Sequence, residues 1–132
     1  MKRIANSIAA LVLLAFLGGC AGMAGAPVKY SDGVMTNSAG MTLYTFDKDA
    51  AGKSACNGPC ATNWPPLMAG ADDKAGGDWS IITRDDGSKQ WAYLGKPLYN
   101  WSKDQKPGDK TGDGFNKAWH VVKSEPPKST MY

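Results

Sequence analysis

Residues 40–49 read GMTLYTFDKD and residues 95–104 read GKPLYNWSKD, so one sequence pattern occurs twice at an offset of 55 residues. The match extends without a gap over 25 positions and ends on a tryptophan in both copies. The identical pairs are Gly40/Gly95, Leu43/Leu98, Tyr44/Tyr99, Lys48/Lys103, Asp49/Asp104 and Trp64/Trp119. Ordinary composition predicts about one or two such identities. The repeat predicts a duplicated supersecondary unit in which each copy needs the other to close its core.

The centre of each copy is a short aromatic segment with the periodicity of a strand. Tyr44 and Phe46 share one face of the expected strand at residues 43–46, and Tyr99 and Trp101 share one face at residues 98–101. An Asp-Gly pair precedes each segment and separates two strand-like runs, which is a strong hairpin signal. Short helical turns are expected after residue 60 and around residues 115–118, because no longer amphipathic pattern occurs.

The composition predicts a small core made mainly of aromatic side chains. Five tryptophans and five tyrosines, each able to bury about 150–250 Å², offset a shortage of aliphatic residues. We therefore expect a mainly β, loop-rich, pseudo-symmetric domain with short helical turns, built from two tandem repeats. The expected organisation is a cleaved signal peptide at 1–19, a lipidated cysteine and tether at 20–27, the domain at 28–124 with repeats at about 28–69 and 83–124, and a loose tail at 125–132.

The start of the chain has the pattern of a bacterial lipoprotein signal peptide. Lys2 and Arg3 precede an apolar run at residues 8–17 that is too short to span a bilayer stably. The following Leu-Gly-Gly before Cys20 resembles a lipobox, in which signal peptidase II cuts before the cysteine and the cysteine receives acyl chains such as palmitate. An ordinary secretory signal is the alternative. We expect Cys20 to anchor the protein in the envelope, and Ala21 resembles the pattern of sorting to an outer membrane.

The charge of the chain argues against one class of partner. Without Lys2 and Arg3 the formal net charge falls from +3 to +1. A nearly neutral domain offers no electrostatic basis for binding nucleic acid or an anionic surface. The predicted partner is therefore the membrane, reached through the lipid, and no nucleic acid is expected. The sequence identifies no protein or small-molecule partner.

Cys56 and Cys60 occur in the first copy alone, where the second has Thr111 and Phe115 at the aligned positions. In an oxidising envelope the favoured interpretation is a structural disulfide, stabilising by roughly 2 kcal/mol for so short a loop. A redox-active or metal-binding pair is the alternative, although the three-residue spacing differs from the Cys-x-x-Cys of thioredoxin-like sites. No Cys-x-x-Cys-His motif for covalent haem is present.

His120 is the only histidine. With a methionine it could ligate haem or copper, but no spacing selects a partner, and a packed or solvent-facing strand histidine is the favoured interpretation. The available methionines are Met35, Met41, Met68 and Met131. A glycine-rich loop with Asp104, Asp109 and Asp113 raises the possibility of calcium binding. It lacks the spacing of an EF-hand, so solvated turn aspartates are the favoured interpretation.

The repeated motif residues have two alternative roles. Their rings can pack together as the core while the aspartates accept turn N–H bonds, or the rings can form an exposed face that stacks a flat ligand. Core packing is favoured. The residues concerned are Tyr44, Phe46, Asp49, Trp64, Tyr99, Trp101, Asp104 and Trp119. No catalytic motif accompanies them, so we expect no enzyme; a hydrolase using paired aspartates is the least favoured hypothesis.

The duplicated Tyr-x-aromatic-x-x-Asp motif, the lipobox and the segment at residues 56–67 together resemble the predicted-lipoprotein family called "secreted repeat of unknown function". The resemblance covers about residues 28–123 and implies an envelope location and a repeat fold, with no catalytic residues and no cofactor. We expect a non-enzymatic binding or structural module that faces the periplasm or the cell exterior. The alternative is a haem- or metal-associated electron-transfer accessory that uses His120, a methionine or the cysteine pair.

Overall fold

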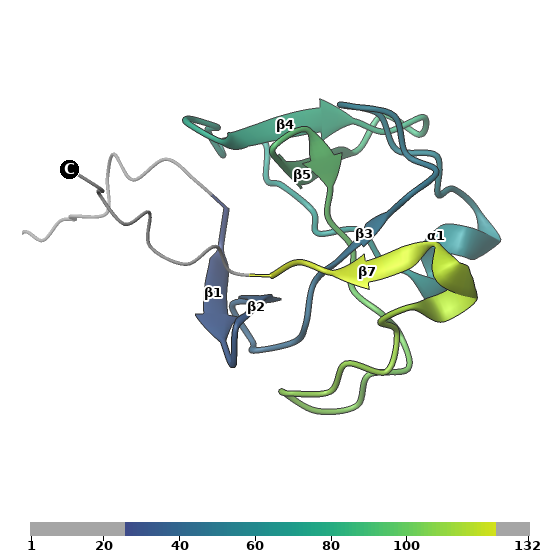
Figure 1. Cartoon of the computed structure of the whole chain (residues 1–132). Helices are drawn as coiled ribbons and strands as arrows, with labels where there is room; N and C mark the ends of the chain where they lie inside the picture. The colour runs from purple at the N-terminus through teal and green to yellow at the C-terminus, as the bar shows by residue number, and fades with distance from the viewer. Residues whose placement is uncertain (1–25, 124–132) are drawn as a thin grey trace, which may run out of the picture.

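The computed structural model describes residues 26–123, which form a mainly β domain (Figure 1). Its elements in chain order are β1 (Val28–Ser31), β2 (Val34–Asn37), β3 (Tyr44–Phe46), α1 (Pro59–Asn63), β4 (Trp79–Thr83), β5 (Lys89–Tyr93), β6 (Lys96–Pro97), the 3-10 turn η1 (Phe115–Lys117) and β7 (Trp119–Val121). The expected mainly β class is confirmed. The expected signal peptide, Cys20 and the tail at 125–132 lie outside the described residues.

Antiparallel pairing joins the strands into three small sheets. They are the β1–β2 hairpin, the β3–β7 pair and a sheet in the order β4–β5–β6. Asp32 and Gly33 connect β1 to β2 with φ values of 51° and 80°, the positive values that a two-residue hairpin turn favours. The hairpin of β4 and β5 has a longer loop, in which the Arg84 N–H donates to the Ser88 carbonyl at 2.8 Å.

The two repeats are joined by crossed pairing. β3 of the first repeat pairs with β7 of the second, placing Tyr44 opposite Val121, and at the corresponding position Tyr99 forms a bridge with Pro66. Tyr44 and Tyr99 also exchange backbone N–H···O bonds of 2.8 and 2.9 Å. Because the aromatic segment of each repeat pairs with the tryptophan segment of the other, neither repeat completes this arrangement alone.

The second aromatic segment differs from the strand expected at residues 98–101. β6 covers only Lys96–Pro97, and Tyr99 forms isolated bridges instead. The Asn100 N–H donates to the Pro65 carbonyl at 2.7 Å, but a proline has no N–H with which to return the bond. In the first repeat the corresponding pair is Thr45 and His120, and a regular ladder forms there. The proline therefore interrupts the second ladder.

Short helical turns form close to where they were expected. α1 and η1 lie near each other, at the end of the molecule opposite the β1–β2 hairpin (Figure 1). No helix within residues 26–123 is long and apolar enough to cross a membrane.

The core consists of two clusters of buried side chains. The larger aromatic cluster contains Tyr44, Cys56, Trp64, Tyr99, Trp101, Ala118 and Trp119. The second cluster contains Met35, Leu43, Leu67, Trp91 and Leu98. Both clusters draw on both repeats. Aromatic side chains dominate the first cluster, as the composition predicted, whereas aliphatic side chains and Met35 dominate the second.

Candidate functional site

Four aromatic rings from both repeats form a continuous stack at the centre of the domain. Trp64 and Trp119 are the inner pair, with ring centroids 3.8 Å apart and planes 1° from parallel. Phe46 stacks on Trp119 at 4.2 Å, and Trp101 stacks on Trp64 at 3.8 Å. Since Phe46 and Trp101 are counterparts in the repeat, as are the two inner tryptophans, the pseudo-twofold relation passes through the middle of the stack.

The tyrosine and aspartate of the repeated motif bind across the repeats. The Tyr44 hydroxyl donates to Asp104 Oδ2 at 2.7 Å, and the Tyr99 hydroxyl donates to Asp49 Oδ2 at 2.7 Å. Both tyrosines are completely buried. Burial raises the pKa of each phenol well above its usual value near 10, and the facing aspartate raises it further. The motif therefore couples the two repeats through a buried, reciprocal pair of hydrogen bonds.

The sequence left open whether the rings of the repeated motif form the core or a ligand face. Most of them lie in the interior. Tyr44 and Tyr99 contact the inner tryptophans edge-on, at 5.3 and 5.1 Å. Trp64, Trp101 and Trp119 are at most 5% exposed, so they do not form an open face. Phe46 is the stacked ring that stays partly exposed.

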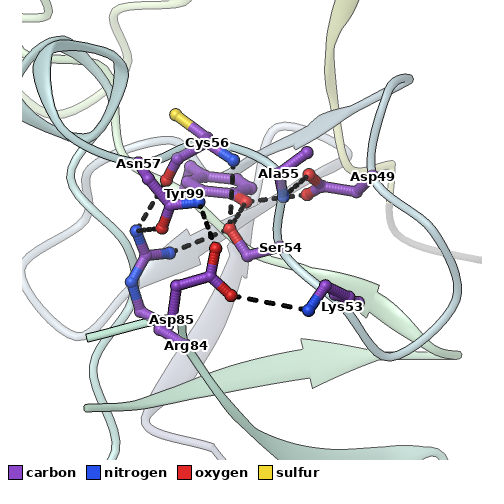
Figure 2. A network of polar contacts seen from close by, with 9 residues as sticks. All are labelled: Asp49, Lys53, Ser54, Ala55, Cys56, Asn57, Arg84, Asp85 and Tyr99. Atoms are coloured by element: carbon purple, nitrogen blue, oxygen red, sulfur yellow. Dashed lines mark hydrogen bonds and ion pairs between the residues drawn. The ribbon is translucent and has the colours of Figure 1, made fainter. Parts of the chain in front are cut away.

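The sequence did not single out Arg84, which organises the polar interior beside the stack (Figure 2). Its guanidinium is buried and donates to Ser54 Oγ at 3.0 Å and to Gln90 Oε1 at 2.7 Å. It also donates to the Cys56 carbonyl at 2.6 Å and to Asn57 Oδ1 at 3.3 Å. The one available signal was that Arg84 is the single arginine after residue 3.

The contacts of Arg84 continue to the repeated motif. Ser54 Oγ lies 2.5 Å from the Tyr99 hydroxyl, which itself donates to Asp49. Burial raises the pKa of Asp49, while the Ala55 N–H, the Tyr99 hydroxyl and the charge of Arg84 lower it. The buried guanidinium is thus linked to the carboxylate of Asp49 through Ser54 and the Tyr99 hydroxyl (Figure 2). The bonds from Arg84 to the Cys56 carbonyl and to Asn57 position the loop that carries the cysteines.

Cys56 and Cys60 form the expected disulfide. Cys56 is fully buried in the aromatic cluster, and Cys60 packs against that cluster while staying partly exposed. The disulfide closes the loop that enters α1, and Arg84 holds its first cysteine through the main chain. In the second repeat Phe115 occupies the place of Cys60 and packs on Trp101 with centroids 5.0 Å apart.

His120 lies at the surface of β7, where its Nε2 atom is 2.8 Å from Asp47 Oδ2. Of the methionines considered as partners, Met35 is buried in the second cluster and Met68 is exposed. Within residues 26–123 no group of three or more His, Cys, Asp or Glu residues is arranged to hold a metal ion. The structure therefore supplies a His–Asp pair at this position.

The aspartates of the glycine-rich loop accept hydrogen bonds from their own loop or its neighbours. Asp104 Oδ1 accepts from the N–H and the hydroxyl of Thr111, at 3.0 and 2.6 Å. Asp109 Oδ2 accepts from two backbone N–H groups nearby, and Asp113 Oδ1 accepts from the Val121 N–H at 3.1 Å. Asp109 and Asp113 therefore accept turn hydrogen bonds at or near the surface, as the sequence favoured. Asp104 differs from that expectation, because it is buried and binds the Tyr44 hydroxyl.

Three cavities lie beside β3, and each is lined by residues of both repeats. Two of them, of about 300 and 290 Å³, share Thr45, Leu94 and Lys96, and we call their combined space the Thr45 groove. A third, of about 300 Å³, is the axial cavity. Its lining comprises Phe46, Lys48, Cys60, Asn63, Trp64, Phe115, Asn116, Ala118 and Trp119. Three of its pairs, 60/115, 63/118 and 64/119, are repeat counterparts, so this cavity lies on the pseudo-twofold axis.

The axial cavity lies at the Phe46 end of the aromatic stack, where the side chains are smaller. Phe115 packs on Trp64 and Trp101, with centroids 5.8 and 5.0 Å away. In the first repeat the counterpart of Phe115 is Cys60 and the counterpart of Trp101 is Phe46, and both of these side chains are smaller. The cavity accordingly is lined by Phe46 and not by Trp101.

The second repeat fills the position that corresponds to the Thr45 groove. Asn100, the counterpart of Thr45, accepts a hydrogen bond from Asn37 Nδ2 at 2.9 Å. Thr42 Oγ1 donates to the Asp109 carbonyl at 2.7 Å, and a Cβ added to Gly40 would lie 3.1 Å from Pro107. The loop at 105–109 therefore covers the space beside Asn100 that stays open beside Thr45. We call the surface around the three cavities the open face.

Comparison with known proteins agrees with the repeat architecture. A family model described as "Secreted repeat of unknown function" matches the chain twice, over residues 26–68 and 80–123. No curated protein and no solved structure matches the chain. The two matches confirm the tandem repeat that the sequence pattern predicted.

Proposed function

This chain belongs to the family of secreted repeats of unknown function, and we propose that it is a lipid-anchored binding module of a bacterial envelope, without catalytic activity of its own. The repeats form the scaffold, and the open face, to which both repeats contribute, is the binding surface. The observation that carries the proposal is the asymmetry: two similar units build one core, but the cavities lie beside β3, whereas the loop at 105–109 covers the corresponding position beside Asn100.

Three features support a binding role. The buried polar groups of the motif are occupied in coupling the repeats, as the Tyr44–Asp104 and Tyr99–Asp49 bonds show. Cavities of about 300 Å³ fall at the lower end of the range for small-molecule sites. A duplicated unit also frees one copy to diverge, since the other can keep the shared packing.

The anchoring part of the proposal rests on the sequence before residue 26. The charged start, the short apolar run and the small residues before Cys20 support lipidation at that cysteine. More than one acyl chain on Cys20 gives durable attachment, whereas a single chain gives marginal attachment. Mass spectrometry of the protein from its native envelope tests this: we expect an acylated N-terminal Cys20, and an unmodified chain cleaved elsewhere contradicts it.

A fragment screen by NMR tests the binding role. The mature chain with Cys20→Ser, made without lipid, is titrated with a small-molecule library while backbone amide shifts are followed. We expect shifts to gather at Thr45, Phe46 and Lys48, with their counterparts Asn100, Trp101 and Lys103 as the internal control. Shifts that affect both repeats equally, or no binder in the library, contradict the proposal.

A further inference from the structure

We propose that the axial cavity binds a planar organic anion, an aromatic or heteroaromatic carboxylate of one or two rings. The inference rests on the proposed binding function and names the ligand class of one of its cavities. Its basis is the combination of aromatic walls, two amides and a cation that has no partner within residues 26–123, around a space of about 300 Å³. A space of that size suits a small ligand.

The walls favour a flat, apolar body. Phe46, Trp64, Trp119 and Phe115 all line the cavity, and Phe115 is 40% exposed. The edge of an aromatic ring carries the positive part of its quadrupole, so ring edges attract the electron-rich face or the anionic group of a ligand. A planar ring can therefore pack here with the same geometry that the core rings use among themselves.

The charge of the cavity favours an anion. Among residues 26–123, Lys48 is the one charged side chain in the lining, and no carboxylate from this part of the chain lines the cavity. Within residues 26–123 Lys48 makes no ion pair or hydrogen bond with another side chain. Its neighbours on the chain are already engaged, Asp47 by His120 and Asp49 by Tyr99. The ammonium is therefore available to a carboxylate from outside.

Two asparagines complete the polar rim. Asn63 ends α1 and Asn116 lies in η1, and both line the cavity and are exposed. Their side-chain NH2 groups are donors that suit a carboxylate oxygen. Asn116 and Lys117 both have left-handed backbone, with φ of 52° and 57°, which is uncommon outside glycine. The backbone at this rim is thus held in a specific conformation.

The walls are held in place before any ligand arrives. Cys60 is fixed by the disulfide, and Trp64 and Trp119 are fixed by mutual stacking at 3.8 Å. A preformed site loses less conformational entropy on binding, which favours affinity for a small ligand.

Three probes of one shape test the ligand class: 2-naphthoate, neutral 2-naphthalenemethanol and cationic 2-naphthylmethylamine. Each is titrated by calorimetry and NMR into the mature chain with Cys20→Ser at low salt. We expect 2-naphthoate to bind about fivefold or more tightly than the other two, and to lose part of that advantage at high salt. Its shifts are expected at Phe46, Asn63 and Phe115.

Lys48 and Lys103 are matched variants, because they are the same residue of the motif in the two repeats and only Lys48 lines the cavity. Lys48→Gln should remove the preference for the anion, and Lys103→Gln should leave it unchanged. Asn116→Gly, which keeps the left-handed backbone, should lower the affinity for 2-naphthoate by a few fold. Far-UV circular dichroism checks that each variant folds.

The outcomes separate the two proposals. Binding on the open face without preference for 2-naphthoate, or an equal loss in both lysine variants, overturns the inference and leaves the binding role standing. Shifts that avoid the open face with all three probes and with the fragment library overturn both.

Discussion

At the scale of residues, the repeated tyrosine and aspartate are a coupling device. In each copy of the motif the aspartate follows the tyrosine by five positions, yet Tyr44 binds Asp104 and Tyr99 binds Asp49. Removing one hydroxyl would leave a buried carboxylate oxygen without its donor, which costs about 1–3 kcal/mol of stability. The repeated tyrosine and aspartate therefore couple the two repeats.

The raised phenol pKa values predict a loss of stability at high pH. The unfolded chain releases the protons of Tyr44 and Tyr99 near pH 10, while the folded protein keeps them. This stabilisation is complete below about pH 10 and declines above it, by at most about 1.4 kcal/mol per pH unit for each tyrosine. Urea unfolding between about pH 9 and 11 measures the slope.

Matched variants identify the source of that slope. Tyr44→Phe and Tyr99→Phe should each flatten it, whereas Tyr30→Phe, at a residue that is 52% exposed, should not. Equal slopes in all three variants would contradict the assignment to the buried pair.

At the scale of elements, the aromatic stack depends on a close approach by the loop before η1. Gly112 is buried, and a Cβ added there would lie 2.6 Å from Trp64 Cη2 and 3.0 Å from Trp101 Cγ. We predict that Gly112→Ala lowers the free energy of unfolding by about 1–3 kcal/mol, because the rings must shift to admit the methyl group.

Gly70→Ala is the control for this prediction. A Cβ at Gly70 would meet Asp73 at an ordinary 3.5 Å, so a change within about 0.5 kcal/mol is expected. Urea unfolding measures both variants. A neutral Gly112→Ala would show that the stack tolerates displacement, against the close packing described here.

At the scale of the whole molecule, the repeats are interlocked units of one fold. β3 pairs with β7, and each tyrosine finds its aspartate in the other repeat. We predict that peptides covering residues 26–78 and 79–123, studied separately, show no cooperative thermal unfolding by circular dichroism. A folded monomer of either half would contradict this interlocking.

Much of the fold could be predicted from the sequence. The 55-residue offset indicated two units, the Asp-Gly pairs marked hairpins, and the short cysteine spacing indicated a disulfide. These features are local or periodic, so the residues that cause them are visible side by side in the chain. The strand at 98–101 was the exception, because its ladder depends on Pro65, which is distant in sequence.

The candidate site was decided by the tertiary structure. The sequence pointed to the difference between Cys60 and Phe115 but could not place those residues beside Trp64 and Trp119. Burial of Arg84 and the exchange of aspartates between repeats were equally invisible, because each depends on partners about thirty to sixty residues away. Repetition along the chain determined that two copies share one core. Only packing across the pseudo-twofold axis decided that the cavities lie beside β3, since a cavity is the space left where smaller side chains meet.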